Sequence, residues 1–142
     1  MALDIESVKI SYALRMAKKY YDESTYNHAL RVMQFVADNK MIPKEYRDEC
    51  IALAIMHDLY EDTEFDGFYL PKNFDQALEL LTKTSGMNYI DYIQNIKKYS
   101  NTSYGKCAWW VKLADMKDHL SQTETLTDRL KEKYLAALPY LL

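Results

Sequence analysis

The stretch CIALAIM, Cys50–Met56, contains apolar residues alone and lies in a segment, Lys44–Leu59, that holds neither glycine nor proline. This composition predicts a helix that begins near Lys44 or Glu45 and reaches Leu59. A helix that is apolar on all sides usually lies in the interior of a protein. We therefore expect this helix at the centre of the fold, with the others packed around it.

Outside this stretch, the chain contains only three glycines and three prolines, and its apolar residues recur at intervals of three and four rather than two. This pattern predicts an all-α protein in a single domain over residues 1–142, with six or seven helices. The segment Glu61–Asn73 contains Gly67 and Pro71 and is expected to form the longest loop. The other expected helices cover residues 5–20, 26–39, 74–82, 89–99, 102–120 and 126–138.

The composition of the chain limits the kinds of protein that it can form. A length of 142 residues with 49% apolar content is sufficient for one core, and the net charge of −3 provides no overall attraction to nucleic acid or an anionic membrane. The beginning, MALDIESVKI, lacks the basic region of a secretory signal. Cys50 and Cys107 form no CxxC motif and are expected to be buried thiols. We expect a cytoplasmic protein without nucleic-acid or membrane partners, whose oligomeric state is left open.

Directly after CIALAIM, the sequence HDLYED brings His57, Asp58, Glu61 and Asp62 to one helix end. Residues three and four apart share a helix face, so these side chains would crowd together. Neighbouring carboxylates repel each other unless a cation lies among them. Imidazole and carboxylate together are ligands typical of Mn²⁺, Fe²⁺ or Zn²⁺. The pattern therefore indicates a divalent metal site.

One helical turn cannot supply all the ligands of such a site, so other helices must contribute. The remaining candidates are His28, in YNHALRV, and Asp115, which follows an apolar stretch in WWVKLADMKDHL. An HD pair at a helix end also has a simpler interpretation, as a cation near the helix C-terminus beside an exposed acid. The spacing alone leaves both interpretations open.

The order of these residues, H…HD…D, resembles that of the HD-domain metal-dependent phosphohydrolases over almost the whole chain. HDLYEDT resembles the HDxxEDT motif of the SpoT/RelA hydrolase branch and its small alarmone hydrolases, and VKLAD resembles the VKLAD segment of that branch. The resemblance implies a compact helical HD-domain bundle that binds one Mn²⁺, or another divalent transition metal. The implied metal ligands are His28, His57, Asp58 and Asp115.

The same resemblance implies catalytic roles for Glu61 and Asp62. In this branch, the acidic pair serves removal of the 3′-pyrophosphate from guanosine nucleotides of the (p)ppGpp type by a metal-activated water, a chemistry that adjacent carboxylates suit. Two alternatives stay open: an HD nucleotidase acting on (deoxy)nucleoside monophosphates, and a non-catalytic nucleotide-binding HD module. The EDT sequence favours the pyrophosphohydrolase.

The positions that would contact substrate depart from the pattern of the branch. Its Arg-Lys pair in the first helix is replaced by KKYY, which offers Lys18 or Lys19 without a guanidinium group. Its Asn one turn after Asp115 is replaced by His119, and its late Arg and Tyr are matched only loosely. The expected substrate-binding residues are Lys18, Lys112, His119, Arg129 and Tyr134.

Overall fold

The computed structural model of the chain describes residues 8–142, and it confirms the all-α prediction, with no strand in that range. Residues 5–7 of the first predicted helix lie outside the described residues. The elements are α1 (Ile10–Tyr20), α2 (Glu23–Asp38), the 3₁₀ turn η1 (Lys44–Tyr46), α3 (Arg47–Met56), the single-turn α4 (Leu59–Asp62), α5 (Lys72–Leu80), α6 (Tyr89–Lys98), α7 (Ser103–Ser121) and α8 (Asp128–Leu141). In the described residues, no helix combines the length and apolar character that a membrane span requires.

Side-chain caps determine several of the helix starts. Asp22 accepts a hydrogen bond from the Thr25 N–H, and α2 consequently begins three residues before the predicted position. Thr102 caps α7 and Thr127 caps α8 in the same way. The predicted end of the last helix at residue 138 is wrong, because α8 continues through Pro139 to Leu141.

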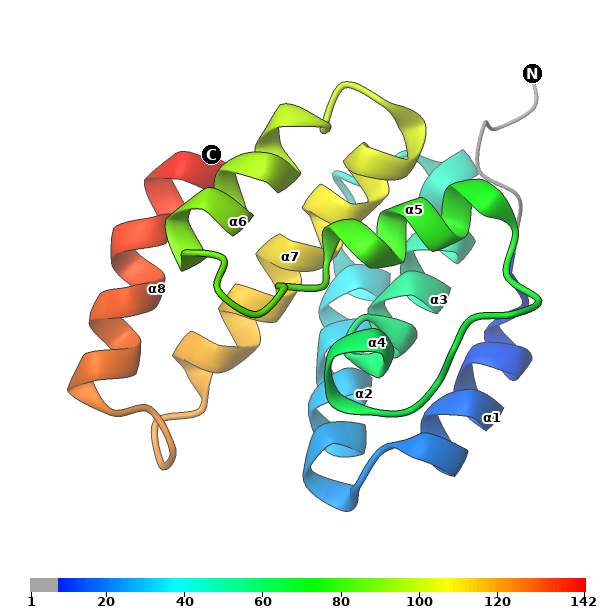
Figure 1. The fold of residues 1–142 in the computed structure, drawn as a ribbon, viewed down its shortest axis with the longest axis horizontal. Coiled ribbons are helices and arrows are strands. Elements are labelled where there is room, and N and C mark those ends of the chain that lie inside the picture. The colour runs from blue at the N-terminus through cyan, green and yellow to red at the C-terminus, as the bar shows by residue number, and fades with distance from the viewer. Residues whose placement is uncertain (1–7) are drawn as a thin grey trace.

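The expected central position of CIALAIM is confirmed. Of these seven residues, all but Ile51 are buried, and α3 packs against α1, α2, α5 and α7. The long helix α7 contacts α2, α3, α5, α6 and α8, so it joins the first helices of the chain to the last two, as Figure 1 shows. The predicted burial of the two cysteines is also confirmed: Cys50 on α3 and Cys107 on α7 are buried free thiols.

The predicted continuation of the central helix to Leu59 is wrong, because α3 ends at Met56 and a turn at residues 57–58 precedes α4. The Tyr21 hydroxyl donates to the Ile55 carbonyl at 2.8 Å and accepts the Asp58 N–H at 3.1 Å. An outside polar group therefore enters the backbone hydrogen-bond ladder at this point, a known cause of helix interruption. The resulting turn presents His57 and Asp58.

The predicted loop after the acidic pair is shorter than Glu61–Asn73, since α4 includes Asp62 and α5 begins at Lys72. Gly67 in this loop has a φ of 68°, a conformation that side chains other than glycine rarely adopt. The Tyr60 ring lies against Gly67, and the Tyr60 hydroxyl donates to Asp75 of α5. The loop is thereby anchored to both helices that flank it.

Candidate metal centre

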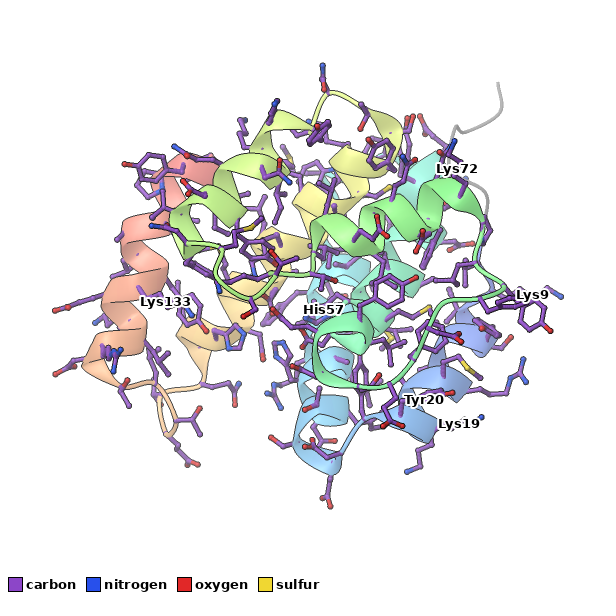
Figure 2. All side chains as sticks on the ribbon, in the orientation of Figure 1. Lys9, Lys19, Tyr20, His57, Lys72 and Lys133 are labelled. Carbon is purple, nitrogen blue, oxygen red and sulfur yellow. The ribbon has the colours of Figure 1, made fainter. Side chains whose placement is uncertain are left out.

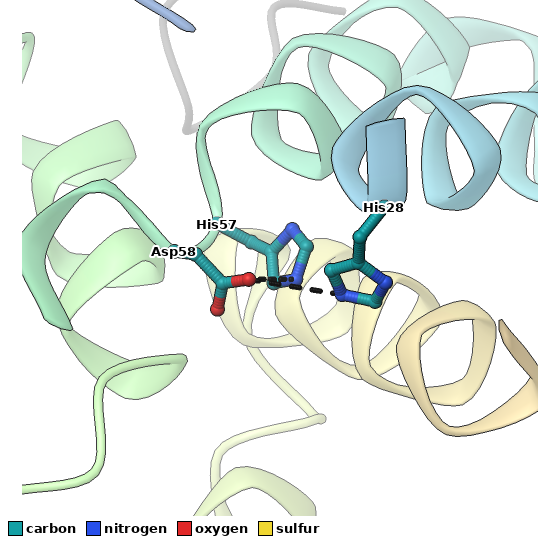
Figure 3. Close-up of side chains that lie close together, drawn as sticks. All are labelled: His28, His57 and Asp58. Carbon is teal, nitrogen blue, oxygen red and sulfur yellow. Dashed lines mark ion pairs between the residues drawn. The ribbon is translucent and has the colours of Figure 1, made fainter. Parts of the chain in front are cut away.

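The four side chains expected to bind metal come together in the structure. His28 comes from α2, His57 and Asp58 from the turn after α3, and Asp115 from α7. The Nε2 atoms of His28 and His57 lie 2.8 Å and 3.2 Å from Asp115 Oδ1. They lie 3.7 Å and 3.2 Å from Asp58 Oδ2, as the dashed lines in Figure 3 indicate. Packing of α2 and α3 against α7 therefore assembles the group.

The spacing of these atoms suits a divalent cation. Ligand atoms that lie roughly 2.1 Å from a metal ion in octahedral geometry are about 3 Å from one another. The ligand atoms of His28, His57 and Asp58 all lie within 4.8 Å of one another. Two imidazoles and two carboxylates form a donor set that Mn²⁺, Fe²⁺ and Zn²⁺ accept. These residues fit the expected ion in both chemistry and spacing.

Each of the two histidines has its other ring nitrogen occupied. The Nδ1–H of His57 donates to the Ala54 carbonyl at 2.6 Å, and His28 Nδ1 lies 2.6 Å from Asp118 Oδ2. Metal-binding histidines commonly donate their second N–H in this manner, which fixes the tautomer and the ring orientation. Both Nε2 atoms are consequently left facing the centre.

Without metal, the ion-pairing of these residues shifts their proton affinities. Burial alone lowers the pKa of His57, but the charge of Asp58 and the hydrogen bond to Asp115 outweigh it and raise the pKa well above its usual value. Burial likewise lowers the pKa of His28, and the hydrogen bond and charge of Asp115 reverse the direction. In the metal-free protein, the carboxylates therefore favour the protonated form of both imidazoles.

Asp115 is held by a buried lysine. Lys112 Nζ lies 2.7 Å from Asp115 Oδ2, while Oδ1 of the same carboxylate faces the histidines. Burial raises the pKa of Asp115, but the Lys112 charge and the imidazole hydrogen bonds hold it well below the usual range. Lys112 Nζ also lies over the rings of Tyr92 and Tyr89, at 4.9 Å and 5.6 Å from their centroids. Lys112, expected to bind substrate, therefore also anchors a candidate metal ligand.

A cavity of about 130 Å³ opens beside two of the four candidate ligands, Asp58 and Asp115. It is lined by Asp58, Glu61, Lys83, Tyr89, Tyr92, Lys112, Asp115, His119, Lys133 and Tyr134. Four residues predicted from the sequence to act on substrate therefore share its wall: Glu61, Lys112, His119 and Tyr134. Figure 2 labels Lys133 on α8 and His57 near the middle of the view.

The two acids of α4 occupy different positions. Glu61 lines the cavity and accepts the Lys83 backbone N–H at 3.2 Å. Partial burial, followed by the charges of Asp58 and Asp62, raises the pKa of Glu61. Both acids are exposed, but Asp62 is not among the cavity residues. Partial desolvation of its carboxyl, followed by the charge of Asp58, raises the pKa of Asp62 as well. Glu61 is therefore the better placed of the two for proton transfer.

His119 lies closer to the candidate metal ligands than the sequence implied. Its Nε2 is 3.3 Å from Asp115 Oδ1, and its ligand atom lies within 4.8 Å of those of His28 and Asp115. The His119 ring stacks on Tyr134, with centroids 4.9 Å apart and an interplanar angle of 11°. His119 is thus a candidate fifth ligand as well as part of an aromatic wall.

Two of the expected substrate-binding residues lie outside the cavity lining. Lys18 is exposed at the end of α1, with Nζ 5.2 Å from the centroid of the Tyr26 ring. Arg129 is exposed in the first turn of α8. Neither side chain is close enough to line the space beside Asp58.

Several residues around the centre were not predicted from the sequence: Tyr21, Arg31, Lys83, Lys133 and Asp118. For Asp118 a signal existed, because it lies three residues after Asp115 and therefore on the same face of α7. Tyr21 and Lys133 carried no comparable local signal, since their relation to the centre depends on contacts between distant helices.

Comparison with protein-family models gives no match, and no curated protein is similar enough in sequence to match the chain.

Proposed function

We propose that this chain is a metal-dependent phosphohydrolase of the HD type, most closely allied to the (p)ppGpp 3′-pyrophosphohydrolases. The observation that carries the proposal is the convergence of two imidazoles and two carboxylates beside a small cavity walled by cations and Glu61. The resemblance of HDLYEDT and VKLAD to motifs of the SpoT/RelA branch adds support from the sequence.

In this proposal, His28, His57, Asp58 and Asp115 hold one Mn²⁺ or a similar divalent ion. Such an ion lowers the pKa of water and neutralises phosphoryl oxygens when it is bound. The Asp115 carboxylate is kept ionised by Lys112, which prepares it as a ligand. Burial of the group excludes bulk water, so each charge acts more strongly than it would at the surface.

Glu61 is the proposed general base. Its carboxylate faces the cavity. Its pKa is raised and thus shifted toward neutral pH, and a general base is most effective when its pKa lies near the working pH. Asp62, exposed next to it, keeps negative charge near Glu61 and Asp58. We therefore assign proton transfer to Glu61 and an electrostatic role to Asp62.

The cavity favours a phosphoryl group as the part of the substrate that enters it. Its volume of about 130 Å³ is well below the roughly 300–1,000 Å³ of pockets that enclose whole drug-sized molecules. Lys83, Lys112 and Lys133 line it, and the positive charges of Lys112 and Lys83 add to burial in lowering the pKa of Lys133. A phosphate would relieve this repulsion, while the nucleoside would remain outside the cavity.

Two alternatives remain within the same site. An HD nucleotidase would release orthophosphate from (deoxy)nucleoside monophosphates, and a non-catalytic module would bind nucleotide without turnover. The position of Glu61 in the cavity wall favours an enzyme over a binding module. We further propose that the protein acts in the cytoplasm on a small-molecule nucleotide, without nucleic-acid or membrane partners. The free thiols of Cys50 and Cys107 are compatible with the reducing cytoplasm.

The test is hydrolysis by the metal-stripped protein with Mn²⁺ added back. Substrates are ppGpp, pGpp and a panel of (deoxy)nucleoside monophosphates, and pyrophosphate and orthophosphate are quantified separately. Release of pyrophosphate from ppGpp supports the proposal. Orthophosphate from monophosphates supports the nucleotidase, and bound Mn²⁺ without turnover of any substrate supports the binding module. The matched control is the same protein with EDTA in place of Mn²⁺.

A further inference from the structure

A buried carboxylate connects His28 to an arginine. Asp118 is 1% exposed, and its Oδ2 lies 2.6 Å from His28 Nδ1. Arg31 holds the same carboxylate with two hydrogen bonds, from Nε to Oδ1 at 2.8 Å and from Nη2 to Oδ2 at 3.1 Å. Both Asp118 oxygens therefore have charged or polar partners, as a buried carboxylate requires.

The arrangement follows from the register of two helices. His28 and Arg31 are three residues apart on α2, and Asp115 and Asp118 are three residues apart on α7. Each pair therefore shares a helix face, and α2 packs against α7. His28 consequently contacts Asp115 through Nε2 and Asp118 through Nδ1.

Asp118 determines which nitrogen of His28 is free. A carboxylate accepts hydrogen bonds only, so the 2.6 Å contact places the proton on Nδ1. Nε2 faces Asp58 and Asp115, and it hydrogen-bonds Asp115 Oδ1 at 2.8 Å in the metal-free protein. Once the Nε2 proton leaves, this nitrogen offers the lone pair that a cation needs, while Asp118 keeps the proton on Nδ1. Rotation of the imidazole would break the bond to Asp118, so the ring plane is fixed as well.

We propose that Asp118, held by Arg31, is a positioning residue that fixes the orientation and tautomer of His28 and thereby raises the affinity of the centre for a divalent cation. This inference rests on the proposed function, because it requires the four ligands to bind metal. Asp118 itself does not touch the cavity.

The other histidine provides an internal comparison. The Nδ1–H of His57 donates to the uncharged Ala54 carbonyl, whereas His28 Nδ1 faces a carboxylate that is paired with Arg31. Charge-assisted hydrogen bonds are stronger than neutral ones. Loss of the Asp118 charge should therefore affect His28 while leaving His57 in place.

The first experiment is Mn²⁺ titration of the full chain by calorimetry. Changes to the orienting partners of metal-binding histidines typically weaken binding about 10- to 100-fold, and we expect a loss in this range for Asp118→Asn. The matched control is Asp38→Asn, which neutralises an exposed acid on α2 whose hydrogen-bond partner is Gln34. This control should bind Mn²⁺ as the unchanged protein does.

The second readout reports the ring of His28 directly. In protein loaded with diamagnetic Zn²⁺, the ¹⁵N signals of the histidine rings distinguish Nδ1–H from Nε2–H and identify the bound nitrogen. We expect metal on Nε2 and a proton on Nδ1 for both His28 and His57. Asp118→Asn should shift the His28 Nδ1–H signal and leave the His57 signals unchanged, a pattern that general loss of stability would not produce.

Arg31 supplies a variant that spares the buried carboxylate. The Arg31 side chain is 41% exposed, so Arg31→Met should fold, and we expect a smaller loss of Mn²⁺ affinity than for Asp118→Asn. Arg31→Lys should recover part of that loss by restoring the charge without the fork. If Asp118→Asn does not fold, Arg31→Met and Arg31→Lys provide the test. An Arg31→Met variant that binds Mn²⁺ as tightly as the unchanged protein overturns the inference.

The outcomes separate the inference from the proposed function. If the unchanged protein does not bind Mn²⁺, the proposed function fails and the inference fails with it. If it binds Mn²⁺ and Asp118→Asn binds equally well with unaltered His28 signals, the inference alone is overturned. Weaker binding with a shifted His28 signal supports it.

Discussion

His57 Nε2 and Asp115 Oδ1 lie 3.2 Å apart although 58 residues separate them in the chain. Both side chains are buried, at the end of α3 and on α7 respectively. The contact therefore depends on the packing of these two helices, and Lys112 reinforces it by holding the other oxygen of Asp115. The stability of the helix pair and the integrity of the centre should consequently vary together.

Asp58→Ala should remove the metal. The Asp58 carboxylate contributes one of the four candidate ligands, and its Oδ2 lies 3.2 Å from His57 Nε2. No other acidic residue is adjacent to His57 in the sequence. Since loss of an orienting partner alone costs about 10- to 100-fold in affinity, loss of a ligand should cost at least about 100-fold. Metal analysis after dialysis provides the measurement.

The control for this change is Asp48→Ala, which removes an exposed acid in the first turn of α3, away from the site. That variant should keep its metal. Stoichiometric metal in Asp58→Ala, equal to that of the control, would show that Asp58 is not a ligand.

Glu61→Gln should leave Mn²⁺ binding unchanged and reduce kcat about 10²- to 10⁴-fold, the usual contribution of a general base. Glutamine retains the shape of Glu61 and can still accept the Lys83 N–H, but it cannot take a proton. Glu64→Gln changes an exposed acid three residues after Glu61; this variant is the matched control and should keep full activity. An equally active Glu61→Gln would exclude Glu61 as the base.

The sequence predicted those parts of the fold that depend on local pattern. Apolar spacing predicted the helical class, and the all-apolar CIALAIM predicted the buried central helix. It could not place the end of α3 at Met56, because that end depends on the Tyr21 hydroxyl, which is distant in sequence. Local propensity contains no information on such a partner.

The candidate site divides in the same way. His28 and Asp115 were candidate ligands from the sequence itself, the order of residues in the resemblance implied the same pair, and the structure brings both to His57 and Asp58. The contact of Asp118 with His28 spans 90 residues, so it follows from the register of α2 against α7 rather than from spacing along the chain. The exposed positions of Lys18 and Arg129 also depend on tertiary packing.

Tyr21→Phe should lower the free energy of unfolding by about 1–3 kcal/mol, because it leaves the Asp58 N–H and the Ile55 carbonyl without the hydroxyl that they share. Urea denaturation of metal-free protein measures this change. Tyr20→Phe, the neighbouring control, removes a hydroxyl that makes neither bond. A Tyr21→Phe variant as stable as the control would mean that water replaces the hydroxyl in the turn.

The stability of the metal-free protein should fall as the pH rises above about 6.5, the usual pKa of histidine in an unfolded chain. Burial alone would lower the pKa of His28 and His57, but the charges and hydrogen bonds of Asp58 and Asp115 raise it in the folded state. The folded protein therefore holds these protons more tightly, and this stabilisation is complete below the unfolded pKa and is lost as the pH passes the folded pKa. Thermal unfolding in EDTA from about pH 6 to pH 9 should show a decreasing Tm.

Excess Mn²⁺ should oppose the decrease, because metal competes with protons for Nε2 and binds more tightly as they leave. A Tm that rises with pH in EDTA would contradict the protonated pairing of these histidines.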